Sequence, residues 1–162
     1  MLLVQGCYAT SLIAQENSIT TCFSPAEKCE DKFLEFLKSA KTSIQIAVYD
    51  IDLPSIIDVL SQKAQENVSV KIVTDPTKAA ANGKNLRTLQ KAGIKIRTGV
   101  QEGHMHNKFV IIDGIKVETG SFNFTKHSYH KNQENQLYIM DAGIAAKYVA
   151  DYSTLWESST KI

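Results

Sequence analysis

Reactive side chains gather in the segment HMHNK at residues 104–108, which directly precedes an apolar run. In an extended strand, residues two apart project from the same face, so His106 and Lys108 are expected to lie side by side. A phosphate held by the Lys108 ammonium would then lie next to the His106 imidazole. The lysine also favours the neutral, nucleophilic form of that imidazole, because it repels a second positive charge. The segment therefore predicts a histidine that reacts with a phosphoryl group.

A second polar cluster follows in the sequence GSFNFT, which starts at Gly120. Gly120 lets the backbone turn sharply, and Ser121 and Asn123, two residues apart, supply a hydroxyl and an amide at one place. These groups are suitable partners for the non-bridging oxygens of a phosphate. Phe122 and Phe124 have the alternate parity, and we expect them to pack in the core and not to stack on bases.

The imidazole of a reacting histidine needs a carboxylate on its other nitrogen. Asp113 is a poor candidate, because it differs in parity from His106 and lies more than about 20 Å along the strand at roughly 3.3 Å per residue. Glu134, at the start of a later strand, is the better candidate for this orienting role.

Overall charge gives no direct indication of a nucleic-acid partner, because 18 lysines and arginines face 17 aspartates and glutamates, for a net charge of +1. Residues 95–131 are locally cationic, with six lysines and arginines against three acidic residues, and contain all four histidines. The pattern fits a phosphate-facing surface or a solvated face. In the same way, His127, His130 and Lys131 fit contacts with a nucleic-acid backbone or an exposed loop.

Alternating β and α patterns predict an α/β fold in which helices flank a mixed sheet on both faces. Strands are expected at 18–23, 43–49, 68–73, 94–97, 108–112, 115–119 and 135–140. Helices are expected at 54–65, 85–92 and 142–156, in addition to one that begins near residue 24. The turn sequence Asp113-Gly114 predicts an antiparallel hairpin. We expect a single domain over residues 21–162 that follows an N-terminal segment, residues 1–20.

The first helix is expected to begin at Ser24-Pro25-Ala26-Glu27, a sequence typical of a capping box with proline in the first turn. Its buried face should contain residues at helical spacing. These are Cys29, Phe33, Phe36, Leu37 and Ala40.

The three cysteines, Cys7, Cys22 and Cys29, match no zinc-site spacing. Cys22 and Cys29 could form a disulfide in an oxidising compartment, or Cys29 could be a buried free thiol. The segment 1–15 lacks lysine and arginine and is too short an apolar run to span a membrane. We take it as a remnant of an export or anchoring sequence, which predicts a periplasmic or membrane-associated envelope location, with a cytoplasmic location as the alternative.

No metal or other cofactor is expected. The region lacks the grouped carboxylates that a two-metal nuclease needs. His104 and His106 could in principle bind zinc, but no third ligand is identifiable. His104 is instead expected to face the substrate or to support its neighbours.

The sequence HNKFVIID, followed by GSFNF, resembles the phospholipase D superfamily, which is marked by HxK(x)4D and a downstream GSxN. The matching residues are His106, Lys108, Asp113, Gly120, Ser121 and Asn123. From Phe23 to about Trp156 the order of strands and motifs is similar to that of the short bacterial endonucleases of the Nuc type. More distantly, it is similar to the animal mitochondrial members that carry one motif per chain.

The resemblance implies a homodimer in which the motifs of two subunits meet at a two-fold axis. It implies that His106 of one subunit attacks the phosphorus while the second imidazole protonates the leaving oxygen. Asp113 and Glu134 join His106 and Lys108 as the expected catalytic set. The expected phosphate-binding residues are Lys108, Ser121, Asn123, His104 and Lys126.

Three functions follow from this pattern. The leading hypothesis is a metal-independent endonuclease that acts on DNA or RNA, with a preference for single-stranded DNA. The alternative is a lipid phosphodiesterase, a phosphatidyl or cardiolipin hydrolase. A nucleic-acid-binding module without turnover is disfavoured by the intact motif residues.

Overall fold

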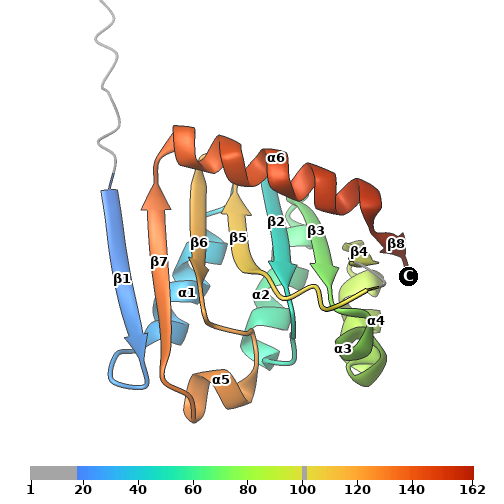
Figure 1. Ribbon diagram of the computed structural model, residues 1–162, viewed down its shortest axis with the longest axis horizontal. Helices are drawn as coiled ribbons and strands as arrows, with labels where there is room; N and C mark the ends of the chain where they lie inside the picture. Colours follow the sequence, from blue (N-terminus) through green and yellow to red (C-terminus); the bar gives the residue numbers. More distant parts are fainter. Residues whose placement is uncertain (1–17, 100–101) are drawn as a thin grey trace, which may run out of the picture.

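Within residues 18–99 and 102–162, which the computed structural model describes, eight strands form one mixed sheet in the order β1-β7-β6-β5-β2-β3-β4-β8. The strands are β1 (Ser18–Ser24), β2 (Ser43–Val48), β3 (Ser69–Thr74), β4 (Lys95–Thr98), β5 (Lys108–Ile112), β6 (Lys116–Gly120), β7 (Glu134–Met140) and β8 (Thr160–Lys161). Strands β2, β3 and β4 pair in parallel, whereas β5 joins β2 and β6 in antiparallel fashion (Figure 1).

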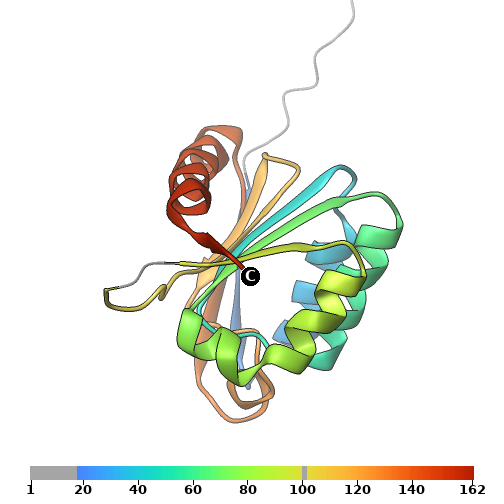
Figure 2. The ribbon, with the colours of Figure 1, turned by 90° about the vertical axis from the view of Figure 1, so that its right-hand side faces the viewer.

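Helices cover both faces of this sheet, as the sequence predicts (Figure 2). They are α1 (Cys29–Lys38), α2 (Pro54–Gln65), α3 (Pro76–Ala81), α4 (Gly83–Lys91), α5 (Lys126–His130) and α6 (Ala142–Ser158). Helices α1, α2 and α4 lie on one face, and α6 crosses the other (Figures 1 and 2). The α/β class is therefore confirmed.

The apolar run of β5 is explained by burial on both faces. Val110 and Ile112 pack in the core under α1 and α2, whereas Phe109 and Ile111 pack in the core under α6. Successive side chains of a strand point to opposite faces, so a central strand needs apolar residues at every position. This rigid strand carries Lys108 at its first position.

The predicted hairpin joins β5 to β6. The connection has three residues, 113–115, and Asp113 and Gly114 have φ values of 54° and 71°, in the left-handed region that tight hairpin turns use. The expected pairing of these strands is confirmed.

The predicted start of the first helix is wrong. Ser24 is the last residue of β1, where it pairs with Glu134 of β7, and α1 begins only at Cys29 without a side-chain cap. Strand pairing thus outweighs the local capping pattern. The helix still buries Cys29, Phe33, Phe36, Leu37 and Ala40, as expected.

Strand β1 begins at Ser18, so the sheet extends into the segment 1–20 that the sequence analysis separated from the domain. The short elements α3, α5 and β8 were not expected. Cys22 and Cys29 form a disulfide between β1 and α1, which resolves the two alternatives for this pair. Cys7 lies outside the described residues.

Candidate active site

The candidate site lies along the lower edge of the sheet in Figure 1. Because the sheet is mixed, the carboxyl ends of some strands and the amino ends of others lie at this edge. The carboxyl ends of β2, β3 and β6 lie at the same edge as the amino ends of β5 and β7. This topology collects residues that are far apart in the sequence. Those that carry functional groups are Tyr49, Asp75, Lys108, Ser121 and Glu134.

His106 and Lys108 form the predicted pair. The Lys108 ammonium lies 3.0 Å from Nδ1 of His106 and donates to the backbone carbonyl of the same residue at 2.7 Å. His106 is exposed and Lys108 is half-buried. The pair therefore combines an accessible imidazole with a fixed positive charge.

Both groups have lowered pKa values. The pKa of His106 is lowered first by partial loss of solvent and then by repulsion from Lys108 and His104. The pKa of Lys108 is lowered by burial, and the Glu134 carboxylate opposes part of this effect. The His106 imidazole therefore stays neutral to a lower pH than a histidine with an ordinary pKa.

Ser121 and Glu134 are in direct contact. The Ser121 hydroxyl donates to the Glu134 carboxylate and accepts from the Asn135 backbone amide at 3.0 Å. The Asn132 amide donates to the other carboxylate oxygen at 2.8 Å. The expectation that Glu134 orients His106 does not hold within one chain, because Glu134 binds Ser121 and Asn132 whereas the His106 ring contacts Tyr49 on the β2 side of β5.

Gly120 serves a different purpose from the one expected. Its backbone is extended and not sharply turned, but a Cβ here would collide with the carbonyl oxygen of Asn135. Glycine is therefore needed for the close approach of β7 that places Ser121 beside Glu134.

Asn123 presents an unpaired polar atom near the site. Its Oδ1 is buried and has no hydrogen-bond partner among the described residues. Oxygen and nitrogen of an amide are exchangeable assignments, so this position can offer a donor to a phosphate oxygen. Phe122 and Phe124 are buried beside Phe33, which confirms that they pack in the core.

His104 contacts Asp75, a residue that the sequence motifs do not indicate. The fully buried Asp75 carboxylate accepts from the Met105 backbone amide at 3.2 Å and lies 3.3 Å from Nδ1 of His104. Its other oxygen accepts from the amides of Thr77 and Lys78 at the start of α3. Burial raises the pKa of Asp75, but these hydrogen bonds outweigh it and lower the pKa overall. Asp75 thereby ties residues 104–105 to the end of β3. The sequence Asp75-Pro76 after a strand is typical of a helix start, but nothing in it predicts the contact with His104.

Asp113 is not brought to the site. It lies at the opposite end of β5, where its carboxylate accepts from the backbone amides of Lys41, Thr42 and Ser43 at 2.9, 2.8 and 2.9 Å. The Thr42 hydroxyl adds a further bond at 2.9 Å. These four bonds outweigh the effect of burial and lower the pKa of the carboxyl. The matched motif position is structural, and its inclusion among the catalytic residues is corrected.

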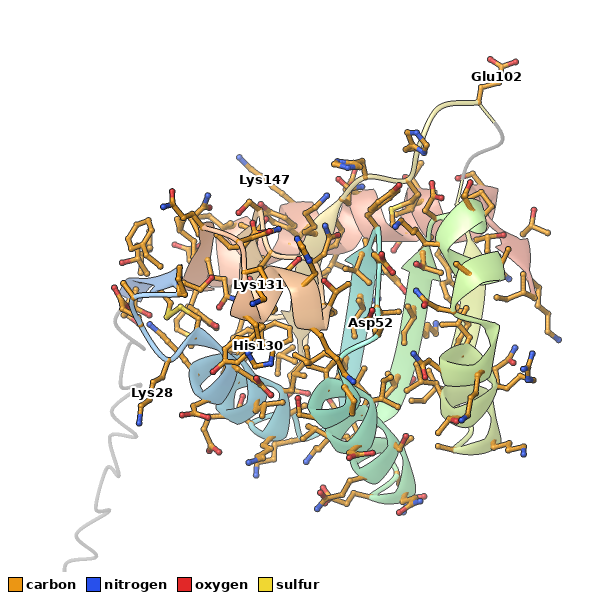
Figure 3. All side chains as sticks on the ribbon, turned by 90° about the horizontal axis from the view of Figure 1, so that it is seen from below. Lys28, Asp52, Glu102, His130, Lys131 and Lys147 are labelled. Carbon is orange, nitrogen blue, oxygen red and sulfur yellow. A yellow bond between two sulfur atoms is a disulfide. The ribbon has the colours of Figure 1, made fainter. Side chains whose placement is uncertain are left out.

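Lys126 likewise does not contact His106, Lys108, Ser121 or Glu134 in the described contacts. Its side chain is exposed, and its backbone amide donates to Asp52 at 2.9 Å at the start of α5. His130 and Lys131, which follow on the same side of the molecule, are also exposed (Figure 3). These cations remain candidates for contacts with a substrate beyond the reacting phosphate.

A hollow of about 400 Å³ adjoins His106 and Lys108 on the side of α6. Most of its lining residues are polar or charged, and α6 contributes Lys147, which Figure 3 labels. The lining residues are His106, Asn107, Lys108, Phe109, Thr119, Gly120, Lys147, Tyr148 and Asp151. A phosphodiester in this hollow would have His106 and Lys108 on its wall.

Comparisons with known proteins agree with the motif. Residues 33–156 match the family described as "Cardiolipin synthase, PLD-like domain". The chain is 33% identical over 126 residues to a mitochondrial cardiolipin hydrolase of Chlamydomonas reinhardtii, covering 78% of this chain but only 56% of that protein. It is 33% identical over 136 residues to a phospholipase D of Rickettsia bellii, covering 84% of this chain and 68% of that one.

The fold also has a close structural match. Nuc from Salmonella typhimurium, a phospholipase D family member, superposes with a TM-score of 0.86 at 31% identity. The match covers 91% of this chain and 99% of Nuc. The two proteins therefore share their fold over nearly the whole length of Nuc.

Proposed function

Because the chain belongs to the phospholipase D superfamily, we propose that it is a phosphodiester hydrolase whose reaction is carried out by His106. The observation that carries this proposal is the 3.0 Å contact between Lys108 and the accessible His106, beside a hollow that both residues help to line. We propose nucleic acid as its substrate, with a preference for single-stranded DNA.

The reaction takes place in two displacements. The neutral imidazole attacks phosphorus, a P–N bond forms, and the P–O bond to the leaving group breaks as a second imidazole gives that oxygen a proton. Water then attacks the phosphohistidine, the second imidazole takes its proton back, and the P–N bond breaks. Free imidazole and a phosphate monoester result.

Lys108 changes its partner in this scheme. Its ammonium faces Nδ1 of His106 in the free protein, and an anionic phosphate would draw it away because charged acceptors form stronger hydrogen bonds. The imidazole is released at the moment when substrate arrives. Ser121 and Asn123 would bind the remaining phosphate oxygens.

The second imidazole is assigned to His106 of the partner subunit, since this chain carries one HxK motif. In a two-fold dimer the two rings are chemically equivalent, and the unprotonated one becomes the nucleophile. Mixing wild-type chains with His106→Ala chains tests this sharing. Activity should fall with the square of the wild-type fraction, whereas a linear fall would show that one chain is sufficient.

A nucleic-acid substrate is favoured by the basic side chains among the residues that line the hollow and by the similarity to Nuc. Among the lining residues only Phe109 and Tyr148 have large apolar or aromatic side chains. A groove between two subunits admits a flexible single strand more easily than a stiff duplex.

Cardiolipin or another phosphatidyl lipid is the second candidate substrate. The observation in its favour is the 33% identity to a mitochondrial cardiolipin hydrolase. Digestion of single- and double-stranded DNA and RNA in excess EDTA, beside release of phosphatidic acid from cardiolipin vesicles, separates the two. We expect cleavage of single-stranded DNA in EDTA; cleavage of lipid alone would contradict the nucleic-acid assignment.

We also propose an oxidising envelope location. Disulfides persist in such compartments and are rare in the cytosol, so the Cys22–Cys29 disulfide supports it. Over residues 18–99 and 102–162, no helix has the length and apolar character needed to cross a bilayer. Thiol labelling of the protein in intact cells tests the proposal, because free Cys22 and Cys29 would contradict it.

A further inference from the structure

We infer that Tyr49 is a positioning residue for His106, and that its aromatic ring rather than its hydroxyl performs this task. The inference rests on the proposed role of His106 in hydrolysis. Sequence considerations favour only a structural role for Tyr49, as the residue that ends the first buried strand.

The backbone of Tyr49 is fixed on two sides. Its amide donates to the carbonyl of Asn107, the residue between His106 and Lys108, at 3.0 Å. Its carbonyl accepts from the Thr74 hydroxyl on β3 at 3.1 Å. The ring therefore extends from a point that is rigidly tied to the catalytic segment.

The ring contacts both histidines of that segment. Its centroid lies 4.7 Å from that of His106 at an interplanar angle of 48°, and 5.7 Å from that of His104 at 84°. Both separations lie in the range in which aromatic rings attract each other. Among the described residues, Lys108 and Tyr49 are the two whose side chains contact the His106 imidazole.

Two ammonium groups also face the ring. Lys108 lies 5.5 Å and Lys78 lies 5.1 Å from its centroid, both within reach of a cation–π contact. Lys78 is itself held at 2.9 Å by Asp50, which raises the pKa of Lys78 and which also accepts from Asn82. The ring is thus braced by a fixed cation as well as by the backbone.

The exposure of His106 gives this contact its importance. An exposed imidazole samples several rotamers, and only those that aim a nitrogen at phosphorus are productive. A ring packed against one side excludes the unproductive rotamers. Its π face also favours the protonated imidazole, the form that must donate to the leaving oxygen.

Two variants separate the ring from the hydroxyl. Tyr49→Phe keeps the ring, and we expect kcat within about twofold of wild type. Tyr49→Leu removes it, and we expect kcat to fall by about 10²-fold with little change in KM, because binding of the phosphate remains. An equal loss in the Phe variant, or no loss in the Leu variant, would overturn the inference.

A second readout does not depend on activity. The chain has four histidines, so their ring signals can be followed by NMR and His106 assigned with the His106→Ala variant. Tyr49→Leu should move the His106 signal, because the ring current is lost, and Tyr49→Phe should not. Tyr129→Leu is the matched control, since Tyr129 packs 4.6 Å from His130 and should move only that signal.

The two readouts distinguish the possible failures. If His106→Ala still hydrolyses substrate, the proposed function fails, while the NMR shift still tests the contact. If the His106 signal and kcat are both unchanged in Tyr49→Leu, the positioning role is wrong even though the proposed function stands.

Discussion

The two ends of β5 carry parts of the same motif but differ in their surroundings. At the amino end, His106 is exposed, and Lys108 faces it with few other partners. At the carboxyl end, the Asp113 carboxylate is saturated by three backbone amides and a hydroxyl. A group with all its hydrogen bonds made is stable but has none left for a substrate. The amino end of β5 therefore has groups free to bind a substrate, whereas the carboxyl end stabilises the fold.

The largest expected effect comes from His106→Ala. Without the nucleophile and acid, turnover should be lost, while substrate binding is largely kept because Lys108 and Ser121 remain. Turnover assays and a binding titration measure the two effects. Unchanged cleavage would contradict the proposed role of His106 in the reaction.

Lys108→Met should lower kcat/KM by about 10²- to 10³-fold, because a charge that stabilises the phosphoryl group is lost. It should also raise the pKa of His106, since repulsion by Lys108 is one cause of its lowering. The acid limb of the pH profile of kcat/KM would then move to higher pH. The burial that is the largest cause persists, so the return is partial.

A matched control for this variant is Lys116→Met at the other end of the hairpin. Lys116 pairs with Ile112 in the register and donates weakly to Ser39 at 3.4 Å. If both lysine variants lose activity equally, the distinction between the two ends of β5 is not valid.

Asp113→Asn should act on stability and not on chemistry. The asparagine amide would face backbone N–H groups, and we expect a loss of about 1–3 kcal/mol in the free energy of unfolding at pH 7. The lowered pKa means that the stabilisation is present above the usual carboxyl pKa and is lost as the pH falls through the folded value.

Urea denaturation at pH 7 and at pH 3 tests this sign. The difference between wild type and Asp113→Asn should narrow at the lower pH, and the folded variant should keep its kcat. Asp58→Asn, an exposed change on α2, should show neither effect. A variant that folds fully but has lost turnover would return Asp113 to the catalytic set.

The smallest expected effect lies between the two ends, at Glu118, which pairs with Val110 in the middle of β5. Its side chain is buried, one carboxylate oxygen lacks a partner among the described residues, and burial raises its pKa well above the usual value. As the pH rises above about 4.3, the unfolded chain ionises while the folded one does not, so wild type loses stability.

Glu118→Gln removes this titration. Its stability relative to wild type should therefore increase from pH 4 to pH 7. Denaturation curves at the two pH values measure the change. Parallel stability profiles would show that Glu118 is ionised in the folded protein.

Much of the arrangement could be predicted from the sequence because it is local. The parity of His106 and Lys108 fixes their shared face, and Asp113-Gly114 fixes the hairpin. The same alternation assigns Phe122 and Phe124 to the core and leaves Ser121 and Asn123 for the site. These patterns depend on neighbours a few residues apart.

The remaining features depend on strand order, which the local pattern does not contain. Tyr49 contacts residues 104–108 because β2 ends beside the start of β5, and Asp75 contacts His104 and Met105, which precede β5, from the end of β3 on the far side of β2. Glu134 begins β7, beyond β6 on one side of β5, whereas His106 contacts Tyr49, which follows β2 on the other side. The capping pattern at Ser24 is overridden by pairing with β7, an interaction with residues more than a hundred positions away.

The most direct test of the account is to trap the covalent intermediate. A substrate with a labelled scissile phosphate is mixed with enzyme, quenched in alkali, and the label is located by peptide mapping. The account predicts an acid-labile, alkali-stable phosphoryl group on His106 in wild type and in Asp113→Asn, and none in His106→Ala. Label on another residue, or rapid turnover of substrate without any label on His106, would contradict it.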